Sequence, residues 1–274
     1  MKHIIVPTDF SATALNAAYY AAGLARQVHA GVMLLHVLPI PITTSEVLMS
    51  PDSYGIALEE ANNALLQLRE KLHVYSNGQL HISYRTTTTS FAEEIEAFKQ
   101  EHDIFAVVMG TTGAGATEAF FLGSFSRMAA KRLHHPLIVV PPAYTYKPIE
   151  KIGLACDMKR MPLSLPVGGL QALLEYYPAT LDILYVSKST EHAYPETVRE
   201  SRFLQSSLSD YDPEIRIVPN DNIKKGLNEV VRQSGIDLLV LLPKERNFTE
   251  GLFHKSVTQK MILHPDVPVM VLHA

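Results

Sequence analysis

The sequence predicts an α/β protein of two similar halves, each a doubly wound, Rossmann-like domain built on a five-stranded parallel sheet. Short apolar segments alternate with longer amphipathic segments along the chain, a pattern typical of strands and helices that build parallel sheets. The order of these segments in the first half recurs in the second, which indicates an internal repeat. Right-handed connections between the strands then place helices on both faces of each sheet.

Short apolar runs predict the five strands of the first half, at residues 4–7, 31–38, 81–85, 104–109 and 137–140. Ser11 is the expected N-cap of a first helix, and Ser90 to Glu93 fit a capping box that opens a third. Residues at helical spacing predict the buried faces of the first two helices. These are Leu15, Ala18, Tyr19, Ala22 and Ala25, then Leu58, Ala61, Leu65, Leu68 and Leu72. A fourth helix is expected at residues 124–133.

The second half repeats this plan, with strands at residues 152–155, 181–186, 215–218, 238–242 and 269–272 and a helix at 223–233. Asp157 falls where Asp9 falls in the first half. We therefore expect one domain at residues 1–145 and another at 149–274, packed as a pseudo-dimer. Strands 137–140 and 268–272 are the expected contact elements, because exposed strand edges pair readily. The sequence leaves open whether two chains also form a homodimer.

Composition excludes several classes of protein. The chain has 274 residues, 47% of them hydrophobic, and a net charge of −4. Because it has no excess of basic residues, we do not expect nucleic acid as a partner. The apolar runs are strand-sized, and the start lacks the features of a signal peptide. We therefore expect a cytoplasmic protein without a membrane partner. Cys156 is the single cysteine, which excludes an intrachain disulfide and a cysteine-based zinc site.

The most informative motif is a glycine-rich loop between a predicted strand and a predicted helix. Gly110 and Gly113 are followed, after nine residues, by Gly123 and Ser124. Glycines allow a ligand to approach the backbone closely, and the N–H groups of a helix start favour a phosphate. The loop therefore predicts a phosphorylated ligand.

This pattern resembles the nucleotide-binding signature of the universal stress protein family. The opening run from Ile4 to Ser11 resembles that family's first strand with its acidic residue, and the run from Leu35 to Val37 resembles the end of its second strand. The resemblance covers the whole chain as a tandem pair, and it is more specific in the first half. It implies the adenine nucleotide alpha hydrolase-like form of the fold.

The resemblance also implies an adenine nucleotide, ATP or a relative, bound in the first half. The acidic residue then lies near the adenosine, the second strand contacts adenine through its backbone, and the glycine loop holds ribose and phosphates. The nucleotide-binding residues implied are Pro7, Thr8, Asp9, Val37, Met109, Gly110, Thr112, Gly113, Gly123, Ser124, Phe125 and Ser126. Asp9 as a simple cap of the first helix is the alternative role for that residue.

Two departures from the family pattern affect the expected affinity. The loop from residue 111 to 122 holds no Lys, Arg or His and carries Glu118, so we expect modest affinity, with Mg²⁺ as an optional counter-charge to the phosphates. In the second half, residues 241–246 replace the first glycines, and Lys255 with Ser256 replaces the final Gly-Ser pair. The second loop is therefore expected to be degenerate. No pair of histidines has strong ligand spacing, and we expect neither a protein metal site nor a catalytic residue.

Three classes of function remain. The first is a stress-response regulatory protein whose nucleotide-bound state modulates an unidentified protein partner. The second is a scaffold of the same fold that binds no nucleotide. The third is a slow nucleotide hydrolase, which ranks last because no motif orients a water, a base and a charge-stabilising group together.

Overall fold

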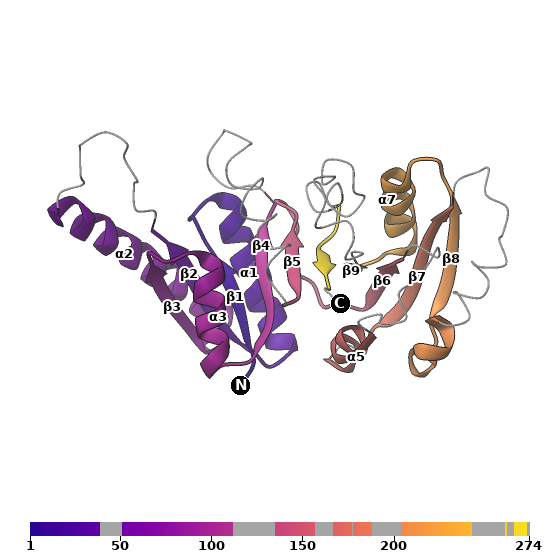
Figure 1. Ribbon diagram of the computed structural model, residues 1–274, viewed down its shortest axis with the longest axis horizontal. Helices are drawn as coiled ribbons and strands as arrows, with labels where there is room; N and C mark the ends of the chain where they lie inside the picture. The colour runs from indigo at the N-terminus through magenta and orange to yellow at the C-terminus, as the bar shows by residue number, and fades with distance from the viewer. Residues whose placement is uncertain are drawn as a thin grey trace. The chain divides into compact units, whose positions relative to one another are not determined.

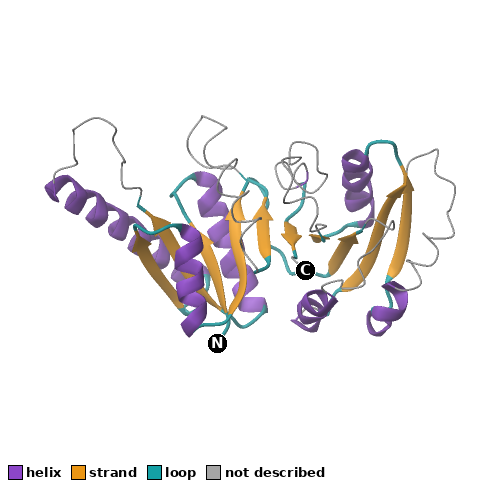
Figure 2. Cartoon of the chain, in the orientation of Figure 1, coloured by secondary structure: helices purple, strands orange, loops and turns teal. Residues whose placement is uncertain are grey.

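The computed structural model describes residues 1–38, 51–111, 135–156, 167–176, 178–187, 204–242, 261 and 266–272. The chain forms two compact units, Met1–His135 and Pro136–Ala274. Each unit is an α/β unit with a parallel core of strands, as the sequence predicts (Figures 1 and 2). The helix predicted at 124–133 lies outside the described residues.

The sheet of the first unit is parallel, and β1 is one of its two inner strands. Its strands are β1 (His3–Pro7), β2 (Gly31–Val37), β3 (Ile82–Thr87) and β4 (Ile104–Gly110), in the order β3–β2–β1–β4. Pro7 pairs with Leu35 at the carboxyl end of the β1–β2 ladder. The chain runs from β1 outward to β3 and then returns to the other side of β1. The order therefore reverses between β1 and β4, which is where ligands bind in open α/β sheets.

In the described part of the first unit, three helices cover this sheet: α1 (Ala12–Gln27), α2 (Pro51–Tyr75) and α3 (Phe91–Glu101). Ser11 caps α1 by accepting a hydrogen bond from the N–H of Ala14, and Ser90 and Glu93 form the predicted capping box of α3. In Figure 1, α3 lies in front of the strands and α1 behind them. On the predicted face of α2, Ala61, Leu65, Leu68 and Leu72 are buried, whereas Leu58 is only partly buried.

The predicted buried face of α1 is wrong in part. Ala18, Ala22 and Ala25 are buried as predicted, but Leu15 and Tyr19 are only partly buried. The alanines at 14, 17 and 21, which the prediction leaves out, are buried as well. Small side chains let α1 approach the strands closely, so the two larger residues sit at the flank of the helix. Tyr19 packs there edge-on against Tyr75 of α2, with ring centroids 5.2 Å apart.

The second unit repeats the arrangement around β6. Its elements are β5 (Leu137–Val140), β6 (Lys151–Ala155), α5 (Val167–Tyr176), β7 (Thr180–Ser187), η2 (Ser209–Tyr211), β8 (Glu214–Pro219), α7 (Ile223–Ser234), β9 (Leu238–Leu241) and β10 (Val269–Val271). The strand order is β5–β10–β9–β6–β7–β8, and every pair is parallel except β5 with β10. The sequence predicts no helix at 167–176, where α5 forms.

Strands β5 and β10 pair antiparallel, with Val139 opposite Val269 and Leu137 opposite Val271. These are the strands that the sequence identifies as contact elements. All four residues are fully buried, so the pairing removes two edges that would otherwise remain exposed.

Two buried carboxylates in the second unit form ion pairs and hydrogen bonds with neighbouring residues. Asp182 of β7 is 2% exposed and lies 3.2 Å from Nζ of Lys151 and 2.5 Å from Nε of Arg216. Asp237, just before β9, accepts hydrogen bonds from the backbone N–H groups of Glu150 and Lys151 at 3.0 and 2.9 Å. Buried carboxylates need such partners, because an unpaired charge in the interior is costly.

Asp237 also binds Lys147 from the segment that precedes β6. The Nζ of Lys147 lies 2.5 Å from Oδ1 of Asp237, and this hydrogen bond is the main cause that raises the pKa of Lys147. The side chain of Lys147 is 57% exposed, whereas that of Asp237 is 7% exposed. The carboxylate of Asp237 therefore stabilises the unit chiefly through its hydrogen bonds to the backbone, because exposed ion pairs contribute little to stability.

No helix within the described ranges is both long and apolar enough to cross a membrane.

Candidate functional site

The described part of the predicted site lies at one edge of the first sheet. Pro7, Val37 and Gly110 are the last residues of β1, β2 and β4, and these strands are adjacent in the order β2–β1–β4. Parallel strands bring their carboxyl ends together, so Pro7, Thr8 and Asp9 lie between Val37 and the pair Met109 and Gly110. The remaining predicted residues lie outside the described part of the chain: Thr112, Gly113, Gly123, Ser124, Phe125 and Ser126.

The turn after β1 is held by its own side chains. Thr8 is buried, and its Oγ1 accepts a hydrogen bond from the N–H of Phe10 at 3.0 Å. Oδ1 of Asp9 accepts from the N–H of Ser11 at 3.0 Å, and Oγ of Ser11 then caps α1. Asp9 therefore shapes the entry to the helix, while Ser11 makes the cap itself. Both roles fix the position of the N-terminus of α1 beside the sheet edge.

Val37 presents its backbone polar groups toward the position where β1 has ended. Even-numbered positions along β2 donate toward β3, as Val32 does to the carbonyl of His81 and Leu38, just after the strand, does to that of Thr87. Odd-numbered residues face β1, as Gly31 does in donating to the carbonyl of Lys2. Val37 therefore faces β1, and within the described ranges no backbone group of the β1 side pairs with it. Its N–H and C=O form a donor and an acceptor side by side.

Gly110 is required by close packing. A Cβ placed on Gly110 would lie 2.7 Å from the carbonyl oxygen of Thr13 and 2.9 Å from its carbonyl carbon. These are backbone atoms in the first turn of α1, which cannot move away without shifting the helix. Its φ is not among the positive values of the chain, so the absence of a side chain is what matters here. Gly110 brings the end of β4 against the start of α1.

The edge formed by the ends of β1, β2 and β4 carries little charge. The segments 7–13, 36–38 and 109–111 contain no Lys or Arg, and Asp9 is their one carboxylate. The first turn of α1 contains no acidic residue, so the partial positive charge of its N-terminus is not offset within that turn. A phosphate near this edge would be bound by N–H groups and hydroxyls, with little help from cationic side chains.

Two residues of this edge, Phe10 and His36, are not among those predicted for the site. Nδ1 of His36 lies 2.8 Å from the carbonyl oxygen of Thr8. The rings of His36 and Phe10 lie 4.8 Å apart with an angle of 32° between their planes. Phe10 has a φ of +63°, which is uncommon for a residue with a bulky side chain. The residue types give no signal for this arrangement, because it depends on strand register.

The hydrogen-bond register identifies the matching positions in the second unit. The N–H of Thr8 donates to the carbonyl of Leu35, and that of Cys156 donates to the carbonyl of Leu184 in the same way. Tyr185 and Val186 therefore occupy the places of His36 and Val37, and both are buried. Asp157 and residues 243–260, which would complete this second edge, lie outside the described residues.

A cluster of aromatic rings lies at the opposite edge of the first sheet, where β1 begins. His3 is buried, with its ring centroid 4.9 Å from that of His102 and 6.3 Å from that of His81. Burial lowers the pKa of His3, and the neighbouring His102 and His81 lower it further. In the described ranges, no group of three His, Cys, Asp or Glu side chains is arranged to hold a metal ion.

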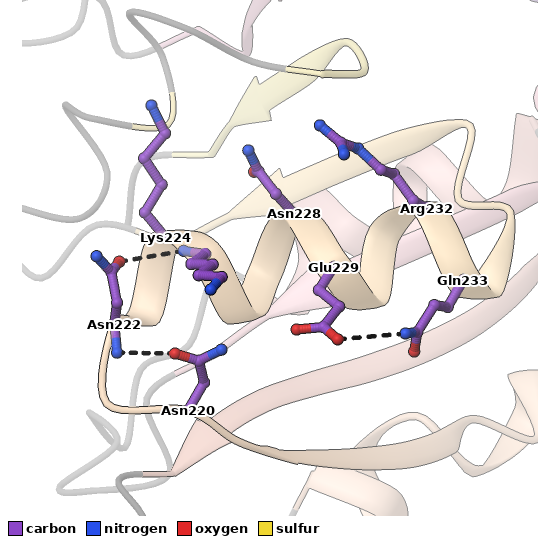
Figure 3. Close-up of a pocket in the computed structure, with 8 residues that line it drawn as sticks. Asn220, Asn222, Lys224, Asn228, Glu229, Arg232 and Gln233 are labelled. Atoms are coloured by element: carbon purple, nitrogen blue, oxygen red, sulfur yellow. Dashed lines mark hydrogen bonds between the residues drawn. The ribbon is translucent and has the colours of Figure 1, made fainter.

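An open concavity runs along α7 in the second unit (Figure 3). It is lined by Asn220, Asn222, Lys224, Lys225, Asn228, Glu229, Arg232 and Gln233. Asn222 caps the helix by accepting from the N–H of Lys225, and Arg232 pairs with Asp266 at 2.7 Å. These contacts account for much of its polar lining, and none of its residues corresponds to the predicted nucleotide site.

Comparisons with known proteins agree with the repeat. The model of the universal stress protein family matches residues 1–141 and 171–273. A universal stress protein of Methanocaldococcus jannaschii is 29% identical over 140 residues, which are 51% of this chain and 81% of that protein.

Solved structures agree at the level of the fold. A universal stress protein from Archaeoglobus fulgidus aligns with a TM-score of 0.72 and 15% identity, covering 99% of this chain and 98% of that chain. The cytoplasmic domain of a prokaryotic cation chloride cotransporter aligns with a TM-score of 0.56 and 12% identity, covering 98% of this chain and 94% of that chain.

Proposed function

The chain belongs to the universal stress protein family as a tandem member, and from this premise we propose that its first half binds an adenine nucleotide and regulates a protein partner through the bound state. The observation that carries the proposal is the edge formed by β1, β2 and β4. There the open backbone of Val37 lies on one side of the β1 turn, and Gly110 packs against the start of α1 on the other.

The backbone of Val37 suits adenine in particular. Adenine offers an acceptor at N1 beside a donor at the exocyclic amine. The N–H of Val37 donates to N1, and its C=O accepts from the amine. Guanine has the opposite order, with a carbonyl at O6 and an N–H at N1, and it would oppose acceptor to acceptor and donor to donor. The proposed site therefore prefers ATP to GTP.

The glycine loop holds the ribose and phosphates in this proposal. Gly110 begins the loop beside the first turn of α1. In this proposal the backbone N–H groups and hydroxyls come from Gly113, Gly123, Ser124 and Ser126. Because this edge carries no Lys or Arg, Mg²⁺ would arrive with the phosphates as their counter-ion. The affinity is then modest and stronger with Mg²⁺ than without it.

The test of the loop is the double variant Gly113→Val with Gly123→Val. Bulky side chains at both positions prevent the backbone from approaching the phosphates, and affinity for ATP is expected to fall at least about 100-fold, which is roughly 3 kcal/mol. Titration calorimetry measures the affinity, and circular dichroism checks that the fold is retained.

The matched control is Gly251→Val, which places the same change in the second loop. It is expected to leave ATP binding unchanged, because that loop lacks the family spacing. A folded double variant that binds ATP as tightly as the natural chain would show that the loop does not hold the phosphates.

A further inference from the structure

The β1–β2 ladder stops one step before Val37. Its last bond runs from the N–H of Thr8 to the carbonyl of Leu35 at 2.9 Å. In a regular parallel ladder, the N–H of Val37 would next donate to the carbonyl of Thr8, and the carbonyl of Val37 would accept from Phe10. Each of these bonds is replaced by a hydrogen bond between the backbone and a side chain.

The first replacement involves His36. Its Nδ1 lies 2.8 Å from the carbonyl oxygen of Thr8. A carbonyl oxygen accepts and cannot donate, so Nδ1 carries the proton of this bond. The imidazole therefore uses the oxygen that the N–H of Val37 would otherwise reach.

The second replacement involves the turn itself. The N–H of Phe10 donates to Oγ1 of Thr8 at 3.0 Å, and its φ of +63° is not the extended conformation that would continue a strand. A left-handed backbone at a residue such as phenylalanine costs about 1–2 kcal/mol. The Phe10 ring, 4.8 Å from that of His36, contributes packing that offsets part of this cost and holds the imidazole in place.

We propose that His36 is a positioning residue of the nucleotide site, which ends the β1–β2 ladder early so that the backbone of Val37 stays open for adenine. This inference rests on the proposed function. It assigns His36 a role in base recognition without direct contact with the base. At the matching position the second unit has Tyr185, whose side chain carries no imidazole.

The test compares His36→Leu with His36→Asn. Leucine removes the donor, whereas the amide nitrogen of asparagine lies about where Nδ1 of histidine lies and can still donate to Thr8. Affinities for ATP and GTP are measured by calorimetry on the natural chain and both variants, with melting temperature as the measure of folding. Leucine is expected to weaken ATP binding about 10-fold and to lower the ATP-to-GTP preference. Asparagine is expected to restore most of both.

The outcomes separate the inference from the proposed function. If the natural chain binds ATP and the leucine variant keeps the same affinity and preference, the inference is wrong and the proposed function stands. Equal losses for ATP and GTP in both variants would indicate a structural role alone and would also overturn it. If the natural chain binds no nucleotide, the proposed function and this inference fail together.

Discussion

Replacing Asp237 by alanine is expected to lower the free energy of unfolding of the second unit by about 2–4 kcal/mol. The substitution leaves the partly buried N–H groups of Glu150 and Lys151 without their acceptor, and a donor left unpaired away from water costs about 1–3 kcal/mol. It also removes the partner of Lys147, although that side chain is 57% exposed and regains water. Chemical denaturation followed by far-ultraviolet circular dichroism measures the change.

Two control variants assign this loss to the backbone bonds. Lys147→Met removes the ion pair alone and is expected to cost under about 1 kcal/mol, as exposed pairs do. Asp237→Asn keeps one oxygen for the two N–H groups and should fall between the natural chain and the alanine variant. If Lys147→Met proves as costly as Asp237→Ala, the backbone bonds are not what holds the start of β6.

Replacing Val37 by proline is expected to weaken ATP binding about 10- to 100-fold. Proline removes the one N–H that the proposal assigns to N1 of adenine, and losing such a bond costs about 1–3 kcal/mol. The β2–β3 ladder keeps its bonds, because it uses the even-numbered residues on either side. Proline also favours an extended conformation at the preceding residue, which His36 already has within β2. Calorimetry with ATP measures the affinity.

Val37→Ala is the matched control. It shortens the side chain but keeps the backbone N–H and C=O, so ATP affinity should change less than about threefold. A proline variant that folds and binds ATP like the natural chain would show that adenine does not use this backbone. An alanine variant as weak as the proline variant would point to the side chain instead.

Much of the fold is predictable from the sequence because its inner strands are buried on both faces. Such strands appear as short apolar runs, and β5 begins and ends where predicted. The strand predicted at 81–85 is observed as β3, which ends at Thr87 because that residue still pairs with Val37.

Other features depend on information that the hydrophobic pattern does not carry. Alanine gives a weak signal of burial, so the predicted face of α1 includes Leu15 and Tyr19, which are only partly buried, and leaves out the buried alanines at 14, 17 and 21. In α5 the run from Val167 to Leu170 includes two glycines and no polar residue, so it shows no clear helical period. The candidate site is likewise predictable only in part. Its position at the edge of the sheet follows from the strand order and the glycine motif. The bond from His36 to Thr8 is not predictable in this way, because it depends on strand register and on the turn at Phe10.

The central claim is that one half of the chain binds an adenine nucleotide, and titration of nucleotide-stripped protein with ATP, with and without Mg²⁺, tests it most directly. The account predicts one site per chain, tighter with Mg²⁺, and weaker binding of GTP. No binding at millimolar ATP would contradict the claim and favour a scaffold that acts through protein contacts alone. Two equivalent sites would show that the second half also binds nucleotide despite its altered loop.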